Sequence, residues 1–275
     1  MASEDAAKKE AQVLDFLRAQ QTIGVAFSGG TDSTYLLALA LEAVGPENVL
    51  ALTAATEFVP PEELEQAREL ARTLGARHET VSLSMLEHPK AAANPPDRCY
   101  WCKKTILTAL RAALGDEREW TLVHGANADD SGAYRPGERA ASELGVPAPL
   151  QMAGLAKTEI RALARARGLP NWGRPADSCL ATRFPYGTQL VPEGLARVAK
   201  AEAFLRTELG LQSLRVRVHG ETARLEVPPE SWPDLLAGEH LTRIVETLRS
   251  LGFVYVTLDL MGLRSGSMDD LLRAP

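Results

Sequence analysis

The chain has 275 residues, of which 45% are hydrophobic and 24% charged, a balance typical of a globular protein that can bury a core without disulfide staples. This composition excludes disorder, collagen and coiled coil as the main architecture, and at roughly 150 residues per domain it predicts one large or two modest domains. The 36 acidic and 30 basic residues give a formal net charge of −6, which argues against a general affinity for nucleic acid, because such binding rests on neutralising phosphates.

The N-terminus and the cysteine count indicate an intracellular protein. The segment Met1–Asp5 carries acids and no apolar core, so it does not resemble a secretory signal. No apolar run approaches the roughly 20 residues that span a bilayer. Three cysteines are an odd number, which does not favour a disulfide framework. We therefore expect a cytoplasmic protein without a membrane partner.

The first part of the chain alternates helices with short apolar strands. Residues 1–20 predict an amphipathic helix, and further helices are expected from Ser33 to about Val44 and from Pro60 to near Gly75. Strands are expected over residues 22–27, 49–53, 78–83 and 120–124. Strands that alternate with helices indicate a parallel sheet. The predicted fold class is therefore α/β, with helices on both faces of the sheet.

Frequent glycine and proline interrupt this pattern over residues 168–192, where no periodicity persists. We therefore divide the chain into a first domain, a linker that carries Cys179, and a smaller α+β domain, over residues 1–170, 171–190 and 191–275. The last domain is expected to fold in the order helix, strand, strand, helix, strand, over residues 193–209, 213–219, 223–227, 236–250 and 253–259.

A glycine-rich segment, Ser28-Gly29-Gly30-Thr31-Asp32-Ser33, lies between the first predicted strand and the next helix. Its glycines let the backbone turn tightly and approach a ligand closely. The free N–H groups and the dipole at the helix start favour an anion. Asp32 either caps the helix or helps to hold a magnesium ion. The P-loop lysine and the GxGxxG pattern are absent, which excludes those two nucleotide folds, and a plain glycine-rich turn is the alternative.

The three cysteines suggest a metal or sulfur site. Cys99 and Cys102 form a C-x-x-C pair flanked by basic residues, and neighbouring cations favour the thiolate, which is the form that reacts or ligates. Together with Cys179 they can hold three corners of a 4Fe–4S cluster and leave the fourth iron open. Zinc with one outside ligand is the competing metal. A redox disulfide between Cys99 and Cys102, or a role as small buried hydrophobes, are further alternatives.

The segment Ser28–Ser33 resembles the signature of the PP-loop ATP pyrophosphatases, which cleave ATP to AMP and pyrophosphate and activate a substrate by adenylation. Nearly the whole chain resembles one PP-loop family, the LarE sulfur transferases. The most specific parts of this resemblance are the runs Cys179–Gly187 and Arg215–Gly220. Further matching runs are Asn94–Tyr100, Gly125–Asp130, Tyr134–Gly137, Pro149–Leu150, Lys157–Arg161 and Ala223–Val227.

The resemblance implies a reaction on pyridinium-3,5-biscarboxylic acid mononucleotide. ATP, with Mg²⁺, adenylates a carboxylate; a sulfur nucleophile then displaces AMP and leaves a thiocarboxylate for the nickel-pincer nucleotide cofactor of lactate racemase. In one branch of the family the cysteine that matches Cys179 gives up its own sulfur and becomes dehydroalanine. In the other branch three cysteines, here Cys99, Cys102 and Cys179, hold a 4Fe–4S cluster whose extra sulfide is donated. Because all three cysteines are present, the cluster branch is favoured.

The predicted site residues fall into four groups. Predicted catalytic residues are Cys179, Asp32 and Arg183. Predicted ATP ligands are Ser28, Gly29, Gly30, Thr31, Asp32, Ser33, Asn127 and Asp130. Predicted substrate ligands are Trp101, Arg215, Arg217, Glu226 and Asp234. Predicted metal ligands are Cys99, Cys102 and Cys179.

Two of these groups rest on position as well as on resemblance. Asn127 and Asp130 follow a strand, and ligands of α/β proteins bind beyond the carboxyl ends of strands. Arg215 and Arg217 alternate on a strand, so both point to one face and suit a phosphate. A solvated strand face with partners such as Glu226 is the alternative for the two arginines.

The resemblance also implies a homo-oligomer, a hexamer in this family, and a nickel-insertion protein that acts downstream. Three rival functions are open. A tRNA-thiolating PP-loop enzyme would need a basic nucleic-acid surface, which the net charge disfavours. An ammonia-using synthetase would need no cysteines at its site. A nucleotide-binding sensor would bind ATP without releasing pyrophosphate.

Overall fold

The computed structural model of the protein describes residues 4–116, 118–132, 136–175, 177–211, 213–264 and 266–268, with only the backbone of residues 131 and 132. The chain divides into two compact units. The first unit comprises the described residues of Met1–Met85 and Asp97–Arg174, and the second those of Leu86–Pro96 and Pro175–Pro275. The short segment Leu86–Pro96 thus packs with the C-terminal part of the chain, although both of its chain neighbours belong to the first unit.

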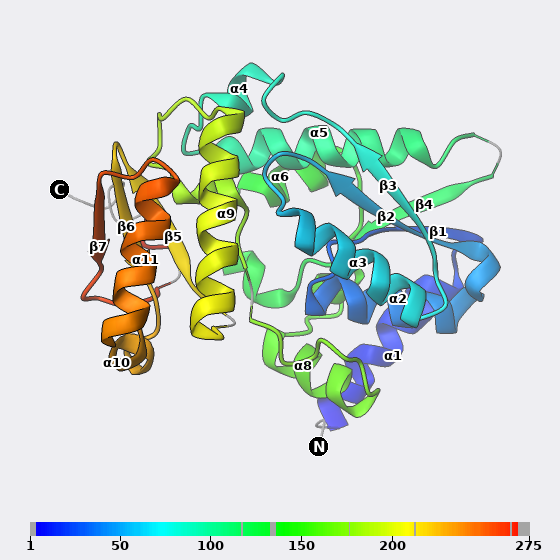
Figure 1. Ribbon diagram of the computed structural model, residues 1–275. Helices are drawn as coiled ribbons and strands as arrows, with labels where there is room; N and C mark the ends of the chain where they lie inside the picture. The colour runs from blue at the N-terminus through cyan, green and yellow to red at the C-terminus, as the bar shows by residue number, and fades with distance from the viewer. Residues whose placement is uncertain are drawn as a thin grey trace. The chain divides into compact units, whose positions relative to one another are not determined.

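The first unit is built on a four-stranded parallel sheet in the order β3-β2-β1-β4 (Figure 1). Its strands are β1 (Thr22–Ala26), β2 (Val49–Ala55), β3 (Arg77–Ser82) and β4 (Trp120–His124). Its helices are α1 (Glu4–Arg18), α2 (Thr31–Val44), α3 (Pro61–Thr73), α5 (Arg98–Ala113), α6 (Pro136–Glu143), α7 (Pro149–Met152) and α8 (Lys157–Ala166), with 3-10 turns η1 (Pro46–Asn48) and η2 (Ala128–Gly132). This arrangement confirms the predicted α/β fold with a parallel sheet.

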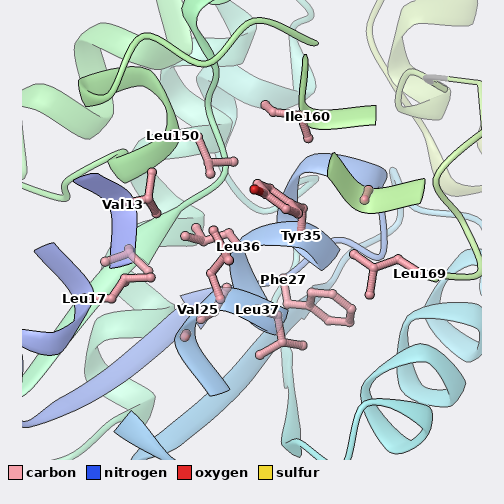
Figure 2. Close-up of a cluster of buried hydrophobic side chains, with 14 of the residues drawn as sticks. Val13, Leu17, Val25, Phe27, Tyr35, Leu36, Leu37, Leu150, Ile160 and Leu169 are labelled. Carbon is pink, nitrogen blue, oxygen red and sulfur yellow. The ribbon is translucent and has the colours of Figure 1, made fainter. Parts of the chain in front are cut away.

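Alternation along the strands separates two apolar cores, because successive strand side chains point to opposite faces. On β2, Val49 and Ala51 join one cluster, and Leu50 and Leu52 join the other. Figure 2 shows the first cluster, in which side chains of α1, β1, α2, α7 and α8 meet. The second cluster contains leucines of α5 and a buried alanine of α6. Helices therefore cover both faces of the sheet, as the sequence predicts.

Gly24 in the middle of β1 brings the strand close to the end of α5. Its neighbours Ile23 and Val25 face the first cluster, so the Gly24 position faces the second. A Cβ atom at Gly24 would lie 2.8 Å from both Cδ atoms of Leu114, a residue of that second cluster. The absence of a side chain at Gly24 therefore allows β1 to pack closely against Leu114 at the end of α5.

The second unit holds a three-stranded sheet in the order β5-β6-β7, in which β5 and β6 are antiparallel and β6 and β7 parallel. Its strands are β5 (Arg215–His219), β6 (Thr222–Glu226) and β7 (Tyr255–Leu258). Its helices are α4 (Pro89–Ala92), α9 (Pro192–Leu209), α10 (Trp232–Leu235) and α11 (Gly238–Ser250), with 3-10 turns η3 (Leu180–Arg183) and η4 (Pro229–Ser231). The smaller α+β part is confirmed. Across both units, the described helices include none that is long and apolar enough to cross a membrane.

We predict that Gly24→Ala lowers the free energy of unfolding of the first unit by about 1–3 kcal/mol, because the new methyl group overpacks against Leu114. Urea titration followed by far-ultraviolet circular dichroism measures the change. Gly173→Ala is the matched control, since a Cβ atom there meets nothing within 4 Å. Equal stability of the two variants would show that β1 and α5 are not closely packed at this point.

Candidate functional site

The glycine-rich segment forms the loop between β1 and α2. Gly29 has φ of +73°, which favours glycine, and a Cβ atom there would lie 3.1 Å from Cα and Cβ of Ala67 on α3. Gly30 occupies the N-cap position of α2, and no described side chain caps this helix end. The positive end of the helix dipole therefore lies at the loop, which is the arrangement that binds phosphate groups in other proteins.

The two serines of the loop bond to each other and to its backbone. Ser28 Oγ lies 3.2 Å from Ser33 Oγ, which also lies 3.0 Å from the carbonyl oxygen of Gly30. The end of β4 comes close on another side, because a Cβ atom at Gly125 would lie 3.0 Å from the backbone nitrogen of Ser33. The absence of a Cβ atom at Gly125 thus permits the close approach of the two backbones.

Asp32 lies in the first turn of α2 and is bound by residues from outside the loop. Its Oδ2 accepts a hydrogen bond of 3.0 Å from Asn127 Nδ2 and lies 3.9 Å from Lys157 Nζ. Its Oδ1 is buried and has no hydrogen-bond partner among the described residues. Burial raises the pKa of Asp32, although Lys157 and Asn127 act in the opposite direction. Asp32 therefore does not cap α2, and its second oxygen fits the carboxylate ligand that Mg²⁺ prefers.

Asn127 and Asp130 shape the turn that follows β4. The backbone N–H of Asn127 donates to Asp130 Oδ2 at 3.0 Å, and the N–H of Asp129 donates to Asn127 Oδ1 at 3.0 Å. Asp129 Oδ2 in turn accepts from the backbone N–H of Lys157 at 2.9 Å. The structure thus brings both predicted residues beside Asp32, Asn127 by direct contact and Asp130 through the turn.

Asn171 fastens the loop from the turn after α8 and was not predicted as a site residue. Its buried side-chain amide donates to Gly29 O and to Thr34 Oγ1, each at 2.9 Å, and its backbone carbonyl oxygen accepts from Thr31 Oγ1 at 2.9 Å. The Thr31 hydroxyl is therefore used within the protein. No local motif marks Asn171, because its role depends on contacts with residues about 140 positions earlier. Lys157 was missed too, although it lies in one of the runs that carry the resemblance.

The C-x-x-C pair lies on the first turn of α5. Cys99 is exposed and Cys102 half-buried, and their spacing places both thiols near one helix face. The guanidinium of Arg98, itself almost fully buried, lies 3.8 Å from Cys99 Sγ. Two cysteine thiols on one helix face are the type of donor that holds iron–sulfur clusters.

Trp101 lies between the two cysteines and is oriented by its neighbours. Its indole Nε1 donates to Asp97 Oδ2 at 3.1 Å, and its ring stands edge-on to Tyr100 with centroids 4.9 Å apart. Tyr100 is buried and donates its hydroxyl to Glu143 Oε2 at 2.5 Å. Trp101 thus has a fixed orientation and stays partly exposed, which keeps the predicted stacking role open to it.

In the second unit, Cys179 precedes the 3-10 turn η3 and is held by Arg183. The Arg183 side chain is 1% exposed and forms two parallel hydrogen bonds, of 2.8 and 3.0 Å, to the carboxylate of Glu202 on α9. Its remaining donors go to Asp177, to Thr182 Oγ1 and to Ser178 and Cys179. Burial alone would lower the pKa of Arg183, but the hydrogen bonds to Glu202 and Asp177 raise it. This arginine shapes the cysteine segment, and its predicted catalytic role stays a prediction.

Arg215 and Arg217 of β5 differ in how fully they are bound. Arg217 is 2% exposed, and its guanidinium donates to Glu226 Oε2 at 3.0 Å, to Ser267 Oγ at 2.9 Å and to Thr182 O at 2.5 Å. Burial lowers the pKa of Arg217 to about 10. Arg215 is half-buried and donates to Arg264 O at 2.7 Å, with no ion pair to any described carboxylate. Arg215 is thus the member of the pair with charge to offer an anion.

For Asp234 and for the three cysteines as a group, the described contacts show no shared site. Asp234 is exposed on α10, and its carboxylate makes no hydrogen bond or ion pair with the described residues. Within the described ranges, no three His, Cys, Asp or Glu side chains gather closely enough to hold a metal ion. Cys99 and Cys102 belong to the first unit and Cys179 to the second, so the three-cysteine site stays a prediction.

Comparison with known proteins extends over both units. A family model for NAD synthase matches residues 10–94. The chain is 41% identical over 266 residues to the pyridinium-3,5-bisthiocarboxylic acid mononucleotide synthase of Lactiplantibacillus plantarum, which covers 97% of this chain and 95% of the relative. It is 41% identical over 251 residues to an uncharacterized protein of Synechocystis sp., a match that covers 90% of this chain and 92% of that relative. A shorter match, 40% over 60 residues, links it to an NH3-dependent NAD+ synthetase of Pyrobaculum aerophilum and covers 22% of each chain.

We predict that Asn171→Asp weakens ATP binding about tenfold, because a carboxylate replaces the amide that donates to Gly29 O and Thr34 Oγ1. Isothermal titration with Mg²⁺ and ATP measures the dissociation constant. Asn48→Asp is the control, since the Asn48 amide donates to a backbone carbonyl at the far end of α2. An Asn171→Asp protein that binds ATP as tightly as the control would contradict the role given to Asn171.

Proposed function

The chain belongs to the LarE family of sulfur transferases, and from this premise we propose that it converts the carboxylates of pyridinium-3,5-biscarboxylic acid mononucleotide to thiocarboxylates at the expense of ATP. One observation carries this proposal. The chain combines a phosphate loop, in which Asp32 keeps one buried oxygen without a described partner, with a cysteine held by a buried arginine. The first feature serves adenylation, and the second serves sulfur transfer.

The first unit supplies the groups for adenylation. The start of α2 and the loop before it bind the phosphates, while Asp32 Oδ1 offers a ligand to Mg²⁺ and Lys157 supplies a positive charge. A substrate carboxylate oxygen attacks the α-phosphorus of ATP, the bond from that phosphorus to the bridging oxygen breaks, and pyrophosphate leaves. The product is an acyl-adenylate, in which AMP is a good leaving group.

The second step transfers sulfur. A sulfur nucleophile attacks the acyl carbon and AMP leaves with the electron pair of the broken carbon–oxygen bond. We propose that Cys99, Cys102 and Cys179 hold a 4Fe–4S cluster, which when bound would supply a replaceable sulfide. In the alternative, the Cys179 thiolate itself attacks; its Cβ–S bond then breaks with loss of the Cα proton, and residue 179 becomes dehydroalanine.

Substrate recognition is assigned mainly to Arg215. Its guanidinium is half-buried and lacks a carboxylate partner in the described part of the chain, which suits the substrate's phosphate. Arg217 and Glu226 form a buried ion pair that stabilises β5 and supports Arg215 on the same strand face. Trp101 offers an aromatic face for the pyridinium ring. Asp234 completes the set as a proposed substrate ligand.

The wider setting is also proposed. We infer a cytoplasmic homo-oligomer, a hexamer by family resemblance, whose product passes to a nickel-insertion protein. The shorter likeness to an ammonia-dependent synthetase, and the family model over residues 10–94, support the ATP chemistry that these enzymes share. They do not account for the cysteines, so an amidating reaction is not favoured.

We predict that Arg215→Gln and Arg217→Gln have different effects. Arg215→Gln raises the KM for the pyridinium nucleotide about tenfold or more, because one charged phosphate contact is lost. Arg217→Gln lowers the free energy of unfolding by about 1–3 kcal/mol, because the buried carboxylate of Glu226 keeps Arg224 and Ser267 on Oε1 but loses the guanidinium of Arg217 from Oε2. Steady-state kinetics and denaturant titration separate the two effects. The reverse assignment, or equal effects on KM, would contradict the account of the arginine pair.

The sulfur source is tested on protein purified without oxygen. The cluster proposal predicts a broad absorption band at the edge of the visible range, with iron and acid-labile sulfide near four each per chain. Both counts should fall to background in Cys99→Ala, Cys102→Ala and Cys179→Ala. A colourless protein that cannot be reconstituted with iron and sulfide would contradict the cluster. Loss of the mass of hydrogen sulfide from residue 179 after one turnover would then identify Cys179 as the donor.

A further inference from the structure

The segment Leu86–Pro96 leaves the first unit, packs with the second and then returns to begin α5. Within it the short helix α4 is capped by His88, whose Nδ1 accepts from Ala91 N at 3.3 Å. Ala91 and Ala92 are buried. The adenylation and sulfur steps use no residue of this segment, although the motif that includes Asn94 is one of those that carry the family resemblance.

Asn94 connects this segment to the residues that follow Cys179. Its side chain is fully buried, and its Nδ2 donates to Pro185 O at 2.9 Å and to Phe184 O at 3.3 Å. Its backbone oxygen accepts from Gly187 N at 2.8 Å. A second backbone bond, from Leu190 N to Ala92 O at 2.8 Å, continues the contact. Asn94 therefore clamps a stretch that begins five residues after Cys179.

The backbone of Asn94 is strained. Its φ is +51°, a left-handed conformation that asparagine tolerates better than most residues. This conformation still raises the free energy of the backbone unless contacts with the surrounding structure offset the strain. The next residue is Pro95, which further restricts the conformation of the residue before it. A side chain with two hydrogen bonds to backbone carbonyls accounts for a conformation that would otherwise be avoided.

The same residue lies close to the other two cysteines along the chain. Four residues, including Pro95 and Pro96, separate Asn94 from Cys99, and a fully extended chain of this length spans at most about 18 Å. The two prolines stiffen this connection, because each fixes its own φ.

We propose that Asn94 is a positioning residue that fixes the conformation of the segment following Cys179, so that the sulfur-transfer step follows adenylation efficiently. This inference rests on the proposed function and extends it to a residue outside the loop, the cysteines and the arginines. It predicts that weakening the clamp affects sulfur transfer and leaves adenylation intact. Acyl-adenylate that is not captured by sulfur would react with water and return the carboxylate and AMP.

The test compares Asn94→Gly with the unaltered protein. Glycine keeps the positive φ and the backbone hydrogen bond from Gly187 but removes the amide that donates to Phe184 and Pro185. Pyrophosphate release and thiocarboxylate formation are measured in the same reaction, without oxygen and after reconstitution with iron and sulfide. We expect pyrophosphate release to be unchanged and thiocarboxylate formed per pyrophosphate to fall about tenfold.

A second measurement reports on the clamp without any turnover. The rates at which iodoacetamide alkylates Cys179 and Cys99 are followed by peptide mass spectrometry in the metal-free protein. Asn94→Gly should accelerate alkylation of Cys179 severalfold and leave that of Cys99 unchanged, so Cys99 serves as an internal reference. Asn94→Asp should act in the same direction, because its carboxylate faces two carbonyl oxygens.

Asn48→Gly is the matched control, since Asn48 also donates its amide to a backbone carbonyl, and it should alter neither measurement. An unchanged ratio in Asn94→Gly would overturn the proposal. A parallel fall in pyrophosphate and thiocarboxylate would also overturn it, by showing a general structural role. If the unaltered protein released no pyrophosphate with the pyridinium substrate, the proposed function would fail, and the alkylation rates would still decide whether Asn94 clamps the Cys179 segment.

Discussion

The buried ion pair between Arg183 and Glu202 is the interaction on which the order of the cysteine segment depends. Both side chains are at most 1% exposed, and each oxygen of Glu202 accepts from Arg183. Removing two charges from water is costly, so such a pair fixes geometry more than it adds stability. Here the cost is offset because Glu202 also accepts from Arg206 and from the backbone N–H of Val216, while Arg183 binds the carbonyl oxygens around Cys179. The irregular backbone before α9 thereby acquires one conformation.

A related device orders the phosphate loop in the first unit. Asn171 and Asn127 come from positions far along the chain. Asn171 donates a hydrogen bond to the backbone oxygen of Gly29, and Asn127 donates one to the carboxylate of Asp32. In both units, therefore, buried polar side chains hold an irregular segment, the loop between β1 and α2 in the first unit and the backbone around Cys179 in the second, against helices and strands. This division suits a two-step reaction, because a loop can approach the ligand closely while the scaffold limits its freedom.

The fold was predictable where the pattern is local. The continuous apolar run from Val49 to Leu52 marks a strand buried on both faces, and the glycines of the loop mark a turn at a helix start. Helix α5 was not predicted, because Cys, Trp and Lys interrupt its apolar positions and its buried members include Arg98 and Tyr100. The crossing of residues 86–96 into the second unit was missed as well, because it depends on long-range hydrogen bonds that leave no periodic trace.

The candidate site was predictable in identity more than in role. The sequence places Arg215 and Arg217 on one strand face, but it does not show that Glu226, Ser267 and Thr182 take up the donors of Arg217 alone. Asp32 was expected either as a cap or as a magnesium ligand, and the structure decides against the cap, because Gly30 occupies the N-cap position of α2 without a side-chain hydrogen bond. Such distinctions require the partners of each side chain, which lie up to about a hundred residues away.

The central claim is that one chain both adenylates the substrate and transfers sulfur through Cys179. The most direct measurement follows pyrophosphate and thiocarboxylate together in Cys179→Ser, given Mg²⁺, ATP and pyridinium-3,5-biscarboxylic acid mononucleotide. The account predicts that this variant still releases pyrophosphate in a substrate-dependent manner and forms no thiocarboxylate. Thiocarboxylate formation at the rate of the unaltered protein would contradict the role of Cys179. If neither protein released pyrophosphate in a substrate-dependent manner, the adenylation step would be contradicted.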